Sequence, residues 1–243
     1  MFSDIHSHLE RKEFKNNLPD VIKRAKKVRL NLILTCGIDL ESNKKALEIS
    51  SKFRIVKPTL GLYPSNKEIP NLQEQLDFIK KNKDLIKGVG EVGMDRPMNG
   101  NQVTKQKELF IKLIDLAKKI NKPLIIHSRG AEKHIVKILE EEKVERAVMH
   151  SFNGPEKYAK KAVEMGFFFS MPPRVLTDES FQKIELIIPN HLVLTETDAP
   201  FLAKEKDKIN EPKNVVETVG FLSKRRNINM EEQIEKNLKK LLG

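Results

Sequence analysis

The sequence predicts an α/β protein with a single-domain, TIM-like (βα)8 barrel over residues 1–243. Short apolar runs alternate with longer amphipathic segments along the whole chain, which is the pattern of repeated βα units around a parallel sheet. Eight such units in 243 residues have the dimension of one closed barrel. An open doubly wound sheet is the alternative, but the glycine-rich phosphate turn that it favours after an early strand is missing from the sequence.

The strands are predicted from eight apolar runs that have the length and composition of strands buried on both faces. In chain order these runs cover residues 2–8, 31–37, 55–61, 86–93, 123–129, 146–152, 167–171 and 192–198. No linker or low-complexity segment interrupts the series, so one domain is expected.

The intervening segments have the periodicity of helices that pack on the outside of a sheet. Between residues 102 and 120, Leu109, Leu113 and Leu116 recur at three-to-four residue spacing, and Lys112 falls outside this stripe. The other candidate helices cover residues 40–52, 71–83, 131–142, 155–165, 178–188, 213–226 and 230–242.

The chain is basic, with 45 Lys and Arg against 34 Asp and Glu and a formal net charge of +11. Such a charge attracts polyanions, nucleic acid among them. A Lys-rich and Glu-rich solvated surface explains it equally well. The basic runs at residues 23–27 and 223–226 fall on predicted helices, so we interpret them as outer faces and not as binding sites.

Several features place the protein in the cytoplasm without a membrane segment. No apolar run approaches the roughly 20 residues that span a bilayer. The first residues lack a basic leader followed by an apolar core, and the single cysteine, Cys36, excludes an internal disulfide.

Metal-ligand side chains gather at the predicted strand ends. In a (βα)8 barrel the reactive groups come from the C-terminal ends of different strands. Four of the six histidines and two carboxylates lie at such ends: His6, His8, Glu91, His127, His150 and Asp198.

Convergence of these side chains predicts a metal site. His6 and His8 lie two residues apart and therefore share one face of the first strand, with Asp4 beneath them. A single buried histidine often only satisfies a core hydrogen bond, but packing does not explain four of them beside two carboxylates. Zinc, manganese, magnesium, iron and cobalt are the candidate ions. Six ligands exceed the four of one tetrahedral zinc, whereas two ions about 3.5–4 Å apart, bridged by a carboxylate and a hydroxide, use all six.

Several motifs occur in one order along nearly the whole chain: FSDIHSH at residues 2–8, GEVGMD at 90–95, HSR at 127–129, HSFNG at 150–154, ETDAPFL at 196–202 and NEP at 210–212. In these residues the chain resembles the TatD-type deoxyribonuclease family of amidohydrolase-like metal hydrolases. The resemblance implies a TIM-like barrel, a binuclear divalent centre and hydrolysis of DNA phosphodiesters, often exonucleolytic. It also implies that Glu91 bridges two ions, one held by His6, His8 and Asp198 and the other by His127 and His150.

The same resemblance suggests catalytic roles. A metal-bridged hydroxide would attack phosphorus in line, and Asp198 is the candidate acceptor for the proton of the attacking water. Arg129 is a candidate phosphate contact, and a structural salt bridge is an equally weighted interpretation of this residue.

The chain departs from the family pattern after the third predicted strand. The family usually has Gly-x-His-Pro-His there, whereas residues 61–65 read Gly-Leu-Tyr-Pro-Ser. Metal binding is expected to survive this change, while phosphate positioning or leaving-group protonation is in question. Tyr63 either replaces a histidine as a hydrogen-bond donor or only packs. Gly130 stands where an acidic residue is common, and Arg96 stands where an aromatic residue is common.

Other polar residues are interpreted as structural. Asp95 could position a ligand or substrate, but an acidic residue in a loop more often forms a turn or a helix cap, so it is left out of the metal site. His134 and His191 are assigned to surface or packing positions, Cys36 to a small buried hydrophobe, and Arg174 to an exposed loop.

The leading hypothesis is therefore a metal-dependent deoxyribonuclease with DNA as substrate. One alternative keeps the site but hydrolyses a small amide, lactone or ester, because similar barrels host such chemistry. A further alternative is a nucleic-acid-binding protein with weak catalysis, which would bind DNA with a steep salt dependence and leave it intact.

Overall fold

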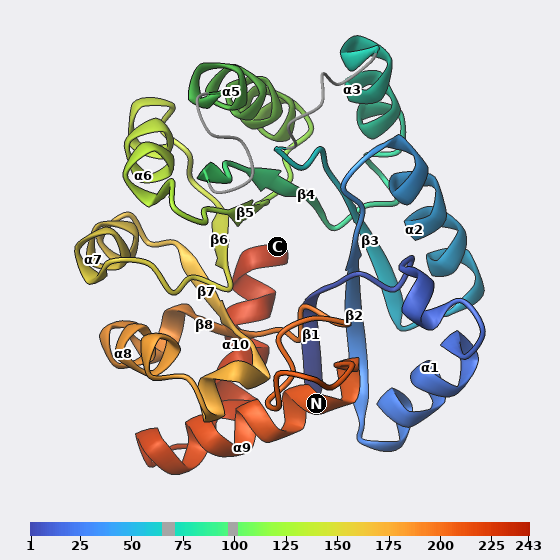
Figure 1. Cartoon of the computed structure of the whole chain (residues 1–243), viewed down its shortest axis with the longest axis vertical. Helices are drawn as coiled ribbons and strands as arrows, with labels where there is room; N and C mark the ends of the chain where they lie inside the picture. The colour runs from blue at the N-terminus through green and yellow to red at the C-terminus, as the bar shows by residue number, and fades with distance from the viewer. Residues whose placement is uncertain (65–70, 97–101) are drawn as a thin grey trace.

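A computed structural model describes residues 1–64, 71–96 and 102–243. Within these ranges, eight parallel strands form one sheet in sequence order, with helices on the outside (Figure 1). The strands are β1 (Phe2–Ser7), β2 (Leu30–Cys36), β3 (Val56–Leu60), β4 (Gly88–Gly93), β5 (Leu124–His127), β6 (Ala147–His150), β7 (Phe168–Met171) and β8 (Val193–Thr195).

The sheet curls until its two edges meet. Beyond β8, Ala199 forms a parallel bridge with Ser7 of β1. The amide of Asp198 donates to the carbonyl of His6 at 2.8 Å, and the amide of His8 donates to the carbonyl of Ala199 at 2.7 Å. These bonds join the C-terminal ends of the first and last strands. The predicted TIM-like (βα)8 barrel is confirmed, and the open doubly wound alternative is wrong.

Apart from the first α-helix, for which no bounds were predicted, the helices lie close to their predicted bounds. Their ranges are α1 (Leu18–Lys27), α2 (Leu40–Lys52), α3 (Leu72–Lys81), α5 (Val103–Lys119), α6 (Glu132–Glu141), α7 (Glu156–Glu164), α8 (Glu179–Ile187), α9 (Val215–Arg226) and α10 (Met230–Leu242). For α2 the start is fixed by a capping box, in which Asp39 accepts from the amide of Ser42 at 2.8 Å and Ser42 accepts from the amide of Asp39 at 2.9 Å. None of the helices in the described ranges is long and apolar enough to cross a bilayer.

The last strand is shorter than predicted, and this matters for the site. The prediction extends it to residue 198, but β8 ends at Thr195. Asp4, which is fully buried, accepts hydrogen bonds from the amide of Thr197 at 2.9 Å and from its hydroxyl at 2.5 Å. The chain therefore leaves the strand ladder in order to bond to β1, and this turn sets the position of Asp198.

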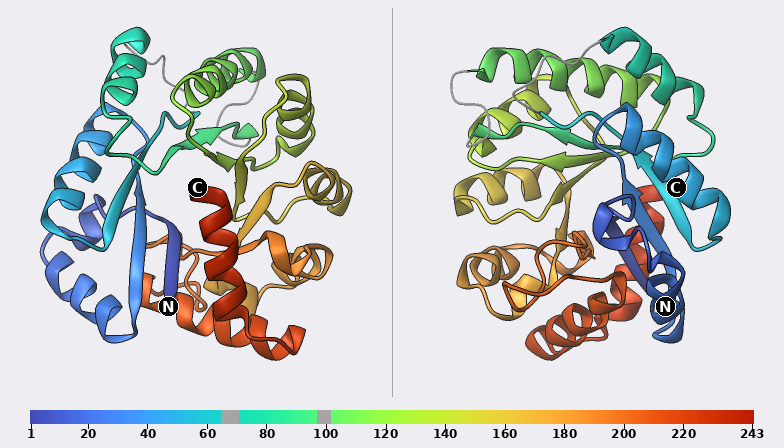
Figure 2. Two further views of the ribbon diagram at one scale, coloured as in Figure 1. Left: turned by 180° about the vertical axis from the view of Figure 1, so that it is seen from behind. Right: turned by 45° about the vertical axis from the view of Figure 1, so that its right-hand side comes forward.

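The opposite end of the barrel is covered by α10. Asn237 of this helix donates to the carbonyls of Val193, at the start of β8, and of Asn190, at 2.7 and 2.8 Å. The amino group of Met1 pairs with Glu231 at 2.7 Å. Because these contacts lie at the strand starts, α10 covers the N-terminal end of the barrel (Figures 1 and 2). The strand C-termini remain free to carry a site.

Candidate metal centre

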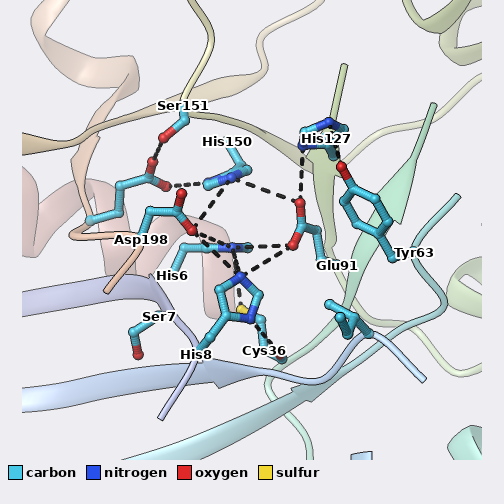
Figure 3. Close-up of polar contacts among 12 residues, drawn as sticks. His6, Ser7, His8, Cys36, Tyr63, Glu91, His127, His150, Ser151 and Asp198 are labelled. Atoms are coloured by element: carbon cyan, nitrogen blue, oxygen red, sulfur yellow. Dashed lines mark hydrogen bonds and ion pairs between the residues drawn. The ribbon is translucent and has the colours of Figure 1, made fainter. Parts of the chain in front are cut away.

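The six predicted ligand residues converge at the C-terminal end of the barrel (Figure 3). They come from β1 and the residue directly after it, from β4, β5 and β6, and from the turn after β8. Their side chains range from fully buried for His6 to 15 % exposed for His127. Residues separated by almost two hundred positions in the chain thus meet in one place, because the carboxyl ends of barrel strands point to a common axis.

One group consists of His6, His8 and Asp198. The Nε2 atoms of the two histidines lie 3.2 Å apart, and they lie 3.5 and 3.4 Å from Oδ1 of Asp198. Ligand atoms that each lie about 2.0–2.2 Å from one ion are separated by roughly 3–3.6 Å. The donor atoms of this group therefore fit around a single metal ion.

A second group consists of Glu91, His127 and His150. Oε1 of Glu91 lies 3.0 Å from Nδ1 of His127 and 3.9 Å from Nε2 of His150. Its other oxygen, Oε2, lies 3.5 and 3.3 Å from the Nε2 atoms of His6 and His8. The carboxylate of Glu91 thus lies between the two groups, with one oxygen toward each.

A buried carboxylate that the sequence reasoning did not single out holds His150. Glu196 accepts from Nδ1 of His150 at 2.8 Å and from the hydroxyl of Ser170 at 2.5 Å, and it also accepts from the hydroxyl of Ser151. Although burial disfavours the charged imidazolium, Glu196 outweighs it and raises the pKa of His150 to about 9. Glu196 also lies close enough to His6 and His150 to form a third possible ligand group. Its oxygens already accept three hydrogen bonds, so we assign it to the support of His150.

A second supporting carboxylate holds His127. Asp95 is fully buried, and its Oδ2 lies 2.9 Å from Nε2 of His127. The same oxygen accepts from the hydroxyl of Tyr63 at 2.5 Å and from Nε and Nη2 of Arg129 at 3.1 and 2.8 Å. Burial opposes ionisation, but these three neighbours hold the pKa of Asp95 well below its usual range. Of the two roles considered for Asp95, these contacts favour the positioning of a ligand over a turn or cap.

Cys36 supports the two histidines of the first strand. Its thiol lies 3.2 Å from Nδ1 of His6, and its carbonyl lies 2.9 Å from Nδ1 of His8. The cysteine is fully buried, as expected, and burial raises the pKa of its thiol. Cys36 belongs to none of the possible ligand groups among the described residues, so we place it beside the site as a buried thiol.

The two candidate ligand carboxylates have lowered pKa values despite their buried surroundings. Burial favours the neutral acid, but hydrogen bonds with His127, His6 and His8 hold the pKa of Glu91 well below its ordinary value. Asp198 also has a lowered pKa, because the bond to His8 outweighs burial. For His6, burial and the neighbouring His150 lower the pKa, which favours the neutral ring that binds metals.

The backbone around the centre adopts unfavourable conformations. Ser151 and Asp198 have positive φ values of 42° and 55°, which non-glycine residues rarely adopt. Gly93 has a φ of 136°, and a β-carbon there would lie 2.0 Å from the carbonyl oxygen of His127. Such strain persists where the surroundings enforce it, and it concentrates at functional sites.

A pocket of about 450 Å³ opens over the two groups. The residues that line it are His8, Arg11, Ile38, Tyr63, Glu91, His127, Arg129, His150, Asp198, Phe201 and Leu202. The two predicted substrate contacts, Tyr63 and Arg129, are both in this lining. Both also donate to Asp95, so the salt bridge considered for Arg129 is present, and Tyr63 is a hydrogen-bond donor.

The assignment of Arg174 to an exposed loop is wrong, because this residue lies in a 3₁₀ helix (Pro173–Leu176) and is only partly exposed. His134 lies on α6 and His191 in a short 3₁₀ helix before β8, and neither lines the pocket. Ser65, part of the departure from the family pattern, falls outside the described residues. The sequence did not single out Glu196. It lies two residues before Asp198, and alternation along a strand would place both side chains on the same face. Sequence pattern also offered no reason to select Arg11 or Phe201, because loop residues carry no periodicity.

Comparison with known proteins identifies the group to which this arrangement belongs. Residues 3–243 match the family described as TatD related DNase. The chain belongs to the TatD-related DNase family. Deoxyribonuclease TATDN3 of Homo sapiens is 30% identical over 246 residues, which cover 96% of this chain and 90% of the human protein. The uncharacterized metal-dependent hydrolase MJ1582 of Methanocaldococcus jannaschii is 34% identical over 233 residues, covering 95% of this chain and 91% of the relative.

Solved structures of TatD proteins have the same fold. The TatD homolog YJJV of Escherichia coli superposes with a TM-score of 0.87 at 23% identity, covering 98% of this chain and 95% of that chain. A TatD-family hydrolase of Entamoeba histolytica gives a TM-score of 0.86 at 22% identity, covering 98% of this chain and 95% of that chain. The predicted resemblance to TatD-type enzymes is confirmed, and this TatD-family chain is a metal-dependent hydrolase.

Proposed function

We propose that this protein hydrolyses phosphodiester bonds of DNA with two divalent metal ions. The observation that carries the proposal is the position of Glu91, whose two carboxylate oxygens face two separate groups of ligand atoms. Membership of a family described as DNases, and the deoxyribonuclease name of the human relative, support DNA as the substrate.

The donor atoms support a division of the ligands between two ions. His6, His8 and Asp198 would hold one ion and His127 and His150 the other, with Glu91 shared. Four imidazoles and two carboxylates suit zinc, manganese, iron or cobalt. Magnesium fits this set less well, because it prefers oxygen ligands.

Two such ions, when bound, would lower the pKa of a water molecule and stabilise negative charge on the phosphate oxygens. The protein supplies the other functions. Asp198 is ionised, because its pKa is lowered, and it is the candidate to accept the proton of the attacking water. Arg129 is half-exposed in the pocket wall, and Asp95 accepts two of its five N–H groups. The others are available to a phosphate oxygen.

Exonucleolytic action is part of the proposal, because the TatD-type deoxyribonucleases that the chain resembles often act in this way. Cleavage of strands labelled at either end distinguishes stepwise removal of nucleotides from internal cuts and also reveals the polarity.

Replacement of the shared ligand tests the proposal. In Glu91→Ala, we expect loss of at least one bound ion and loss of cleavage of single-stranded and duplex DNA. Metal content by elemental analysis and nuclease activity should be measured on the same preparation. Cleavage that persists in metal-free protein would show that the mechanism is wrong.

One observation favours a different substrate for the same site. Tyr63 takes the place of a family histidine, and Ile38, Phe201 and Leu202 make part of the pocket wall apolar. A small amide, lactone or ester would fit such a wall. Hydrolysis of these compounds with no cleavage of DNA would select this alternative, whereas salt-dependent DNA binding without any hydrolysis would select a binding protein.

A further inference from the structure

The pocket wall contains a guanidinium group that no acidic side chain among the described residues neutralises. Arg11 lies three residues after His8 and lines the pocket. Across the described residues, its side chain takes part in no ion pair or hydrogen bond, and its Nε is buried without a partner. Arg129, by contrast, is bound to Asp95. A partly buried cation without an anion is costly, so Arg11 is the cation in the pocket that is ready for an anionic ligand.

An exposed aromatic ring lies beside this guanidinium. Phe201 is 43% exposed, and Cζ of Arg11 lies 5.3 Å from the centre of its ring. The ring centre of His8 is 6.2 Å from it in an edge-to-face arrangement. In the described ranges, five other large apolar side chains are exposed, and none of them lines the pocket: Met1, Leu85, Leu186, Ile209 and Ile228.

The contact between the two side chains positions Arg11 without neutralising it. A cation over an aromatic face is attracted by the ring quadrupole and keeps its full charge. The guanidinium can then still donate two parallel hydrogen bonds to phosphate oxygens. An aromatic ring accepts any nucleobase by stacking, because every base has a π-face. A cation that can bind a phosphate and an aromatic ring that can stack on a base therefore lie side by side, and a nucleotide contains both of these groups.

We propose that Arg11 and Phe201 form a nucleotide subsite next to the metal centre. Arg11 binds the phosphate adjacent to the one that is cleaved, and Phe201 stacks on the base of the neighbouring nucleotide. This subsite rests on the proposed DNA hydrolysis, which it deepens by adding contacts beyond the scissile bond. The subsite would bind the DNA strand beside the reacting phosphate, which lies at the metal centre.

Matched variants and modified strands test the subsite. Phe201→Ala should be assayed on a short single strand and on strands with an abasic residue placed in turn on either side of the scissile phosphate. Loss of one stacked base costs roughly five- to hundredfold in affinity. We therefore expect Phe201→Ala to raise KM for the normal strand by about tenfold or more. On the strand that lacks the stacked base, the variant and the wild type should have similar KM values. Phe201→Tyr should restore the wild-type KM, since it keeps the ring.

The corresponding pair for the charge is Arg11→Gln with a neutral methylphosphonate at either flanking phosphate. In Arg11→Gln, KM for the normal strand should rise by about tenfold. On the strand that lacks the contacted charge, the KM of the variant should be close to that of the wild type. Lys12→Gln is the matched control, because Lys12 is the exposed cation next in the chain and does not line the pocket. It should stay within about twofold of wild type.

The pattern of losses separates the subsite from a structural role. A purely structural effect would lower activity equally on normal, abasic and neutral strands, and this outcome would overturn the subsite. Equal losses in Arg11→Gln and Lys12→Gln would also overturn it, since they would reflect only general electrostatic attraction.

A binding measurement separates failure of the subsite from failure of the proposed function. Fluorescence anisotropy with the same strands in EDTA gives affinities without cleavage. The slope of log K against log salt should fall by about 0.7 in Arg11→Gln, as for one lost phosphate contact to a single strand. If the wild type binds but never cleaves, DNA hydrolysis is refuted while the binding data still decide the subsite. If the wild type cleaves and the loss in each variant is the same on normal and modified strands, the subsite alone is refuted. If no strand binds in EDTA and none is cleaved when divalent metal is supplied, both are refuted.

Discussion

Each of the four ligand histidines has its second ring nitrogen next to a protein group. The neighbours are the Cys36 thiol for His6, the Cys36 carbonyl for His8, Asp95 for His127 and Glu196 for His150. Such contacts fix the tautomer and the orientation of a ligand ring and increase its basicity. The histidines are therefore positioned before any metal binds. The two carboxylate neighbours, Asp95 and Glu196, contact the two histidines that form a group with Glu91.

Asp95→Asn tests this support at the scale of one residue. The amide keeps the size of the side chain but removes the charge that faces His127 and Arg129. Metal affinity is expected to fall by about 10–100-fold, as measured by competition with a chromophoric chelator. Asp77→Asn on α3 removes an exposed charge and should bind metal like the wild type. Unchanged affinity in Asp95→Asn would contradict a positioning role.

At the scale of elements, the site depends on the close approach of neighbouring strand ends. At Gly61, after β3, a β-carbon would lie 2.3 Å from the carbonyl oxygen of Glu91. At Gly93, at the end of β4, it would lie 2.0 Å from the carbonyl oxygen of His127. Real β-carbons do not come this close, so both positions require glycine. The glycines of these strands thus bring Glu91 and His127 within contact of each other.

Gly93→Ala should therefore damage both stability and metal binding. The new methyl group would clash with the backbone of β5 at a φ that alanine disfavours, at a cost of roughly 2 kcal/mol or more. The melting temperature should fall by roughly 4–8 °C in a chain of this size. Gly166→Ala is the control, because its φ is 77° and nothing lies within 4 Å of the added carbon. It carries only the backbone strain, so an equal loss in both variants would rule out the clash.

At the scale of the whole molecule, α10 covers one end of the barrel and leaves the site at the other. Asn237 is 3% exposed and joins α10 to the start of β8. Elsewhere on the surface, lysine and glutamate pair at i,i+4 spacing on α2, α6, α7, α8 and α10. Pairs of this kind contribute little to stability. A share of the many lysines therefore forms a solvated surface.

Asn237→Ala should destabilise the fold without changing the chemistry. It would leave the carbonyls of Val193 and Asn190 without their donor, at a cost of about 1–3 kcal/mol, or roughly 2–12 °C in melting temperature. Lys236→Ala, an exposed change on the same helix, should melt within about 1 °C of wild type. Equal melting of the two variants would show that α10 is held by apolar packing alone. Cleavage per folded molecule should be unchanged in both.

Metal removal should lower the stability of the whole barrel. Without ions, the buried carboxylates of Glu91 and Asp198 are balanced only by neighbouring imidazoles. Ions that bind the folded chain stabilise it by mass action, by about 2.7 kcal/mol at a hundredfold excess over Kd. Calorimetry with and without EDTA should show the lower melting temperature in EDTA, and Glu91→Ala should show a smaller difference. No shift in the wild type would argue against a preformed site.

The sequence by itself determined the barrel and the residues that converge at the candidate metal site. Residue periodicity distinguishes strands from helices locally, and α2 and α10 accordingly begin and end where predicted. His6, Glu91 and His127 could be selected because a parallel barrel brings every strand C-terminus to one end.

Only the tertiary structure decided which groups support these ligands and which remain free. Asp95 faces His127, β8 stops at Thr195, and Arg11 has no acidic partner in the part of the chain that the structure describes. None of these features follows from local pattern. Each depends on contacts between segments far apart in the chain, such as the bond from Asp4 to Thr197. Periodicity reports the face on which a side chain lies, whereas its partners are set by how the loops and strand ends pack.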